Sequence, residues 1–118
     1  MTTPVWDRWR GLFGWSLVRV DGNSMAPALN DGDYVLARRD RNSVEPNAVV
    51  VIRHPSLGRM VKRVRARDAD GRYLVAGDNA LSIRSDAIGA LDGDTITGRV
   101  RWRVSPDGLQ RIRDGARD

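Results

Sequence analysis

Short apolar segments separated by Asp-Gly pairs constrain the fold of this chain more than any other feature of its sequence. Six segments have the pattern of strands: 17–20, 34–39, 48–53, 59–67, 72–76 and 95–104. Turn signals lie between them at Asp21-Gly22, Asp31-Gly32, Asp70-Gly71 and Asp92-Gly93. Residues 68–71 are typical of a hairpin loop that pairs the two segments beside it. We therefore expect a mainly β fold, a single compact domain of antiparallel strands over residues 17–104.

The two ends of the chain differ from this strand pattern. Over residues 1–16 we expect an amphipathic segment, with four apolar residues at helix-like spacing: Trp6, Trp9, Leu12 and Phe13. This segment either folds over the core or makes a weak contact with a membrane surface or a substrate through Trp6, Trp9 and Phe13. Residues 105–118 are polar, and we expect a frayed tail there.

The composition excludes several classes of protein. A chain of 118 residues with 41% hydrophobic and 30% charged residues fits one small soluble domain. No run approaches the roughly 20 apolar residues that span a bilayer, so we expect no membrane anchor and a cytoplasmic protein. Because the chain has no cysteine, it cannot build a disulfide bond or a thiolate metal site. Its one histidine, His54, also argues against a metal cluster held by histidines. We expect no metal ion.

The net charge of +5 leaves nucleic acid, anionic lipid and acidic proteins open as partners. Arginines alternate along two of the expected strands, where they are able to contact phosphates: Arg63, Arg65 and Arg67, then Arg99, Arg101 and Arg103. Trp102 has the opposite parity to its neighbours and is expected to face the core. Because solvated strand faces explain the alternation more simply, nucleic acid is the less favoured partner.

Lys62 is the only lysine among twenty basic residues, and the other nineteen are arginine. Side chains alternate between the two faces of a strand, which divides residues 59–67 into two sets. One face carries Met60, Lys62, Val64 and Ala66, and the other carries Val61, Arg63, Arg65 and Arg67, of which the arginines are expected to point toward solvent. Burial disfavours the charged ammonium, so a lysine on the apolar face is a candidate general base with a lowered pKa. The alternative is a lysine that extends its ammonium past the strand end into water.

Ser24 is the candidate nucleophile, because it lies in a glycine-containing connection between two expected strands. In such a turn a hydroxyl is exposed and backbone N–H groups are able to point at a reacting carbonyl. A serine in a turn carries little weight by itself. His54 is a less favoured base for Ser24, because His54-Pro55 begins an expected surface loop.

Four motifs resemble, in order and interval, those of the signal peptidase I superfamily of Ser-Lys dyad proteases. They are Val20-x-Gly22-x-Ser24-Met25-x-Pro27-x-Leu29, Gly32-Asp33, Val61-Lys62-Arg63-Val64 and Gly77-Asp78-Asn79. The resemblance covers roughly residues 17–104 and implies a signal-peptidase-like β domain. Within the superfamily the chain resembles the short, soluble maturation proteases of nickel-type superoxide dismutase.

The resemblance implies a role for each matching residue. Ser24 is then the nucleophile, Lys62 the general base and the Ser24 backbone N–H an oxyanion donor. The second oxyanion donor stays unassigned, because some relatives have a serine where this chain has Gly22. Met25 either lines the substrate groove or belongs to the core. The remaining motif residues are expected to be structural: Gly32, Asp33, Gly77, Asp78 and Asn79. A Ser-Lys mechanism needs no cofactor.

The Gly77-Asp78-Asn79 motif departs from the family pattern after Asn79. Ser82 best matches the serine that orients the lysine, and Ser85 is the second choice. The Asp-Ser-Arg that follows in the family is replaced by Arg84-Ser85-Asp86. Either these residues form a reversed ion pair or the site is less ordered.

The function that the resemblance implies is an endopeptidase that removes an N-terminal propeptide from a precursor polypeptide, with the nickel superoxide dismutase precursor as target. Three alternatives share parts of the pattern. They are a leader peptidase acting at the membrane surface, the self-cleaving half of an SOS-type repressor, and a catalytically weak module that binds substrate or nucleic acid.

Overall fold

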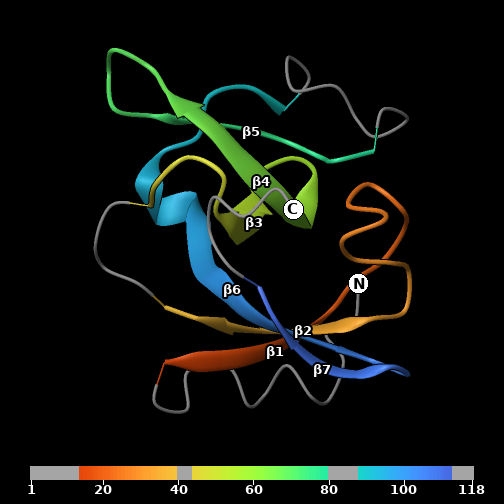
Figure 1. The fold of residues 1–118 in the computed structure, drawn as a ribbon. Helices are drawn as coiled ribbons and strands as arrows, with labels where there is room; N and C mark the ends of the chain where they lie inside the picture. Colours follow the sequence, from red (N-terminus) through yellow and green to blue (C-terminus); the bar gives the residue numbers. More distant parts are fainter. Residues whose placement is uncertain (1–13, 40–43, 80–87, 113–118) are drawn as a thin grey trace.

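A single antiparallel sheet of seven strands forms from the residues that the computed structural model describes, 14–39, 44–79 and 88–112 (Figure 1). The strands are β1 (Trp15–Arg19), β2 (Tyr34–Arg38), β3 (Val49–His54), β4 (Gly58–Arg67), β5 (Tyr73–Ala76), β6 (Ile96–Ser105) and β7 (Gly108–Arg111). Their order is β1-β2-β6-β3-β4-β5, and β7 pairs with β6. The expected mainly β, antiparallel fold is confirmed. A short 3-10 turn, η2 (Gly93–Thr95), leads into β6.

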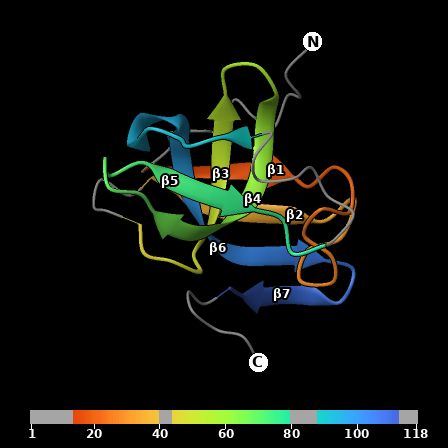
Figure 2. The same cartoon turned by 90° about the horizontal axis from the view of Figure 1, so that it is seen from above.

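The long strand β6 joins two parts of the sheet. Its first half pairs with β3, and its second half pairs with both β2 and β7. In Figure 1 β1, β2 and β7 lie below, β3, β4 and β5 lie above, and β6 runs from one group to the other. Figure 2 shows the same crossing from above. The sheet therefore curls enough to enclose apolar side chains between its two parts.

Strand β3 is buried on both faces and separates two apolar clusters. Val49 and Val51 belong to a first cluster with Val18, Met25, Leu29, Val35, Ala37, Val61 and Val100, among others. Val50 and Ile52 belong to a second cluster with Val64, Tyr73, Val75, Ile88 and Leu91, among others. Because side chains alternate along a strand, a strand between two clusters needs apolar residues at every position. The run Val49–Ile52 within β3 meets this need, and all four of its residues are buried.

Two β-bulges overturn side-chain directions that strict alternation predicts. On the β4–β5 pair, Val64 lies opposite Val75 and Ala66 lies opposite Leu74, so Val64 and Ala66 point to different faces. On the β2–β6 pair, the register shifts between Leu36 and Ala37, and Trp102 leaves the face of the core. An extra residue in one strand reverses the parity of all residues beyond it. The expectation for Ala66 and that for Trp102 were therefore wrong.

The expected frayed tail was wrong over Gly108–Arg111, which form β7 against the end of β6. All four residues of β7 are exposed, so the segment gave no apolar pattern to detect. The Arg111 guanidinium lies 5.5 Å from the centre of the Trp102 ring, a cation-π contact on the solvent side. The residues proposed for an interfacial contact, Trp6, Trp9 and Phe13, lie outside the described residues. Within the described ranges, no helix is long and apolar enough to cross a membrane.

Candidate active site

The connection that carries Ser24 runs from β1 to β2 and is closed at its base by backbone hydrogen bonds. Val20 N–H donates to Asp33 O and Gly32 N–H donates to Val20 O, each at 2.8 Å. Gly22 and Gly32 have φ angles of 83° and 87°, a region that favours glycine. The Gly22 N–H donates to Asp31 Oδ1 at 2.7 Å, so it closes the turn instead of facing a substrate.

Ser24 itself is half-buried, and the residue after it anchors the connection in the core. Met25 and Leu29 have no exposed surface, and both belong to the first apolar cluster. Of the two roles considered for Met25, the structure shows the core role. Two turn hydrogen bonds, from Ala26 N–H to Asn23 O at 3.1 Å and from Leu29 N–H to Met25 O at 2.9 Å, hold the backbone on either side.

Asp33 explains the Gly32-Asp33 motif as a structural feature. The residue is 4% exposed, and its carboxylate accepts hydrogen bonds from Arg103 Nε at 2.7 Å and from the Asn30 N–H at 2.8 Å. Hydrogen bonds and a charged partner of this kind compensate a buried carboxylate for the water that it loses. The pair ties the Ser24 connection to β6, and sequence reasoning missed it because Arg103 was interpreted as a solvent-facing residue.

Lys62 lies in the middle of β4 with 3% of its surface exposed. It faces Val50 across the β3–β4 pair and shares its side with Met60 and Val64, which pack with the second cluster. Burial lowers the pKa of the Lys62 amine below the ordinary lysine value, because the ammonium form loses its hydration. No carboxylate of the described residues lies within ion-pair distance of this amine. The apolar setting predicted by parity is therefore confirmed at Lys62.

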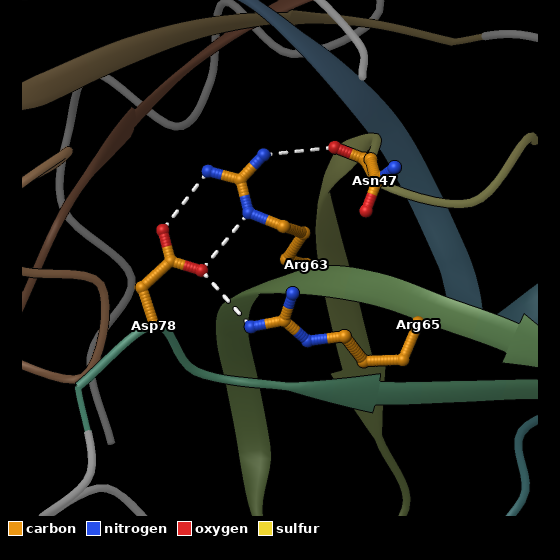
Figure 3. A network of polar contacts seen from close by, with 4 residues as sticks. All are labelled: Asn47, Arg63, Arg65 and Asp78. Atoms are coloured by element: carbon orange, nitrogen blue, oxygen red, sulfur yellow. Dashed lines mark hydrogen bonds and ion pairs between the residues drawn. The ribbon is translucent and has the colours of Figure 1, made fainter. Parts of the chain in front are cut away.

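Arg63 was expected to face solvent, and the structure shows that this was wrong. Its side chain is 13% exposed, and it binds Asp78 through two hydrogen bonds of 2.9 Å, from Nε to Oδ1 and from Nη2 to Oδ2 (Figure 3). Nη1 donates to the Asn47 carbonyl at 2.8 Å. Arg65, with 46% of its side chain exposed, reaches the same carboxylate at 3.3 Å. The curled sheet leaves room on this side of β4 for Asp78, which follows β5.

The Gly77-Asp78-Asn79 motif touches the Ser24 connection directly. The backbone N–H of Asn79 donates to the backbone carbonyl of Ser24 at 2.8 Å. The structure thus brings Ser24 and the Gly77-Asp78-Asn79 motif together, and Asp78 in turn binds the strand of Lys62. It records no hydrogen bond between Ser24 Oγ and Lys62 Nζ. Met25 beside Ser24 packs in the first cluster, whereas Lys62 lies on the side of the second.

The remaining candidate residues are the two serines after Asn79 and His54. Ser82 and Ser85, with their neighbours Arg84 and Asp86, lie outside the described residues. Nδ1 of His54 accepts from the backbone N–H groups of Ser56 and Leu57 at 3.0 Å each, and Nε2 lies 2.9 Å from Ile88 O. Both ring nitrogens are therefore engaged in structural contacts. In the described part of the chain, no cluster of acidic or histidine side chains could hold a metal ion.

Comparison with known proteins identifies the family to which this chain belongs. None of the curated proteins matches the chain. Residues 14–101, however, match the Peptidase S24-like family, which belongs to the superfamily of SOS-type repressors and signal peptidases. The matched region contains Ser24, Lys62 and the Gly77-Asp78-Asn79 motif. The chain therefore belongs to the Peptidase S24-like family and has a serine-peptidase type of fold.

Proposed function

We propose that this protein is a serine endopeptidase in which Ser24 is the nucleophile and Lys62 the general base. The observation that carries the proposal is the buried amine of Lys62, whose pKa burial lowers. The family match over residues 14–101 supports it, because that match includes both residues. A lysine whose amine has lost its proton is able to accept one from a serine hydroxyl.

The reaction begins when the neutral Lys62 amine takes the Ser24 hydroxyl proton as Oγ bonds to the scissile carbonyl carbon. The Ser24 backbone N–H donates to the oxyanion that forms. The carbon–nitrogen bond then breaks, and the Lys62 ammonium returns its proton to the leaving amine. A water molecule attacks the ester while Lys62 takes one of its protons; the proton returns to Ser24 Oγ as the acid leaves. Atoms and charge balance, and no histidine or cofactor is required.

The substrate we propose is a precursor polypeptide that loses an N-terminal propeptide in the cytoplasm, specifically the nickel superoxide dismutase precursor. Support for this target comes from the resemblance of the motif set to the soluble maturation proteases. Any nickel belongs to the product and not to this chain.

Intact-mass spectrometry of the precursor after incubation with this protein tests the proposal. We compare the wild type with Ser24→Ala, Lys62→Arg and the exposed-site control Arg65→Gln across neutral to alkaline pH. Lys62→Arg keeps the charge and removes the base. We expect the wild type and the control to release one defined N-terminal peptide, faster as pH rises toward the Lys62 pKa, and both dyad variants to be inert.

A binding module without turnover is the second candidate. The observation in its favour is that no hydrogen bond joins Ser24 Oγ to Lys62 Nζ. An intact precursor in every sample would remove the proposed target. A serine-reactive acylating probe that labels Ser24 would then indicate a protease with another substrate, and no labelling would indicate the module. The mass of the protein itself, followed in the same samples, reports self-cleavage.

A further inference from the structure

Hydrogen bonds hold both peptide groups that flank the Ser24 side chain. The carbonyl of Asn23 accepts from the Ala26 N–H at 3.1 Å, and the carbonyl of Ser24 accepts from the Asn79 N–H at 2.8 Å. Both peptide bonds are trans. In a planar trans peptide the C=O and the following N–H point in opposite directions. The two hydrogen bonds therefore also fix where the N–H groups of Ser24 and Met25 point.

The first of these bonds is local, whereas the second depends on a distant part of the chain. Asn79 directly follows Asp78, whose carboxylate Arg63 binds at two points. The Arg63 guanidinium has a third bond, to the Asn47 carbonyl, which stops it from turning with the carboxylate. Because the two side chains are only 13% and 15% exposed, solvent screens this ion pair weakly. The position of Asn79 against Ser24 is thus set from β4, one residue from Lys62.

We propose that the Arg63–Asp78 ion pair positions the nucleophile by holding the Asn79 N–H against the Ser24 carbonyl. In doing so it fixes the Ser24–Met25 peptide group on the C-terminal side of the nucleophile, while the local bond from Ala26 N–H to Asn23 O fixes the Ser24 N–H that donates to the oxyanion. The catalytic part of this proposal rests on the proposed function, while the positioning part does not. A nucleophile acts because it is held in the productive geometry before the reaction, and a misplacement of about 1 Å costs on the order of 10²-fold in rate. Arg63 and Asp78 are positioning residues and touch no substrate.

The chain offers a control for the ion pair, because Arg65 binds the same carboxylate from an exposed position. We compare Asp78→Asn and Arg63→Lys with Arg65→Gln, all at a temperature where circular dichroism shows each variant folded. Lysine keeps the charge of Arg63 but cannot make its bidentate contact. The two readouts are the rate of Ser24 acylation by a serine-reactive probe as a function of pH, and amide hydrogen exchange of Asn79.

We expect Asp78→Asn and Arg63→Lys to lower the plateau rate of acylation about tenfold or more. The pH midpoint of the rate stays at the wild-type value, because the base is unchanged. Exchange of the Asn79 amide speeds up about tenfold or more, while the amides of Val50 and Val100 in the core exchange as in the wild type. Arg65→Gln changes neither the rate nor the exchange.

Each contrary result has a separate meaning. If Asn79 exchange stays at the wild-type rate in Asp78→Asn, the ion pair does not hold Ser24 and the positioning role is overturned. The catalytic role is overturned if exchange speeds up while acylation of the folded variants is unchanged. If the wild-type protein is not acylated at any pH, the proposed function fails, and the exchange measurement by itself decides whether the ion pair holds the Ser24 backbone.

Discussion

Two buried ionisable residues, Asp33 and Lys62, differ in whether a partner of opposite charge compensates them. Asp33 is paired with Arg103 and with a backbone N–H, which compensates the carboxylate for lost water. Lys62 has 3% exposure and no recorded carboxylate partner among the described residues. A paired ion at Asp33 is typical of a structural role. At Lys62, a buried amine without an ion-pair partner among the described residues destabilises the fold in its charged form, which is typical of a functional group.

Replacement of Lys62 by methionine should stabilise the protein at neutral pH. Methionine has a similar length and no charge to desolvate, so we expect a free energy of unfolding higher by roughly 1 kcal/mol or more. Because folding lowers the Lys62 pKa, the unfolded chain binds more protons between the lowered and the ordinary pKa, and wild-type stability rises with pH there. The advantage of Lys62→Met should therefore shrink toward alkaline pH. Urea unfolding of both proteins at several pH values measures it; a constant difference would contradict burial of the charged amine.

The Asp33–Arg103 pair should be worth more than an exposed pair of the same chemistry. Asp33→Asn leaves a buried arginine without its charged partner, and we expect a loss of about 3 kcal/mol in the free energy of unfolding. The matched control is Asp21→Asn, which removes the ion pair with Arg19 at side-chain exposures of 53% and 84%. This control should change stability by less than about 1 kcal/mol. Equal losses in thermal or urea unfolding would show that Asp33 is not a structural anchor.

A strand was predictable from the sequence where its side chains are buried in an apolar cluster. A strand was not predictable where only backbone pairing with another strand holds it. The segment 48–53 predicted β3, because the part of this strand that lies between the two clusters, 49–52, is apolar at every position. The segment 108–111 gave no signal, because β7 is exposed at all four positions and is held by backbone pairing. The bulges beside Arg65 and Arg101 depend on the register of β5 and β2, which no single segment encodes.

The two kinds of strand should respond differently to truncation of an apolar side chain. Ile52→Ala in β3 removes atoms from a side chain with no exposed surface, and we expect a loss of about 2–5 kcal/mol in the free energy of unfolding. Leu109→Ala in β7, at 59% exposure, should cost no more than about 0.5 kcal/mol. Chemical denaturation with a single optical probe measures both. A large loss at Leu109 would show that β7 packs against more than β6.

At the scale of the whole molecule, the sheet brings four sequence motifs to one place through contacts that the sequence shows only in part. The resemblance supplied Ser24, Lys62 and the Gly77-Asp78-Asn79 motif in order. It did not supply the bond from Asn79 to Ser24, the pairing of Arg63 with Asp78, or the Asn47 carbonyl that fixes Arg63. These contacts join residues far apart along the chain, and strand parity had placed Arg63 in solvent. Long-range polar pairs of this kind depend on how the sheet curls.

The central claim is that Lys62 is the base that activates Ser24, and the single lysine of this chain makes it directly measurable. Protein labelled with ¹³C at the lysine ε-carbon gives one side-chain NMR signal, which reports the Lys62 pKa by titration. In parallel, the pH dependence of Ser24 acylation by a serine-reactive probe is measured on the same protein. We expect a Lys62 pKa below the ordinary lysine value and an acylation rate that rises with the same midpoint. An ordinary Lys62 pKa, or acylation whose midpoint differs from it, would contradict the assignment of Lys62 as the base.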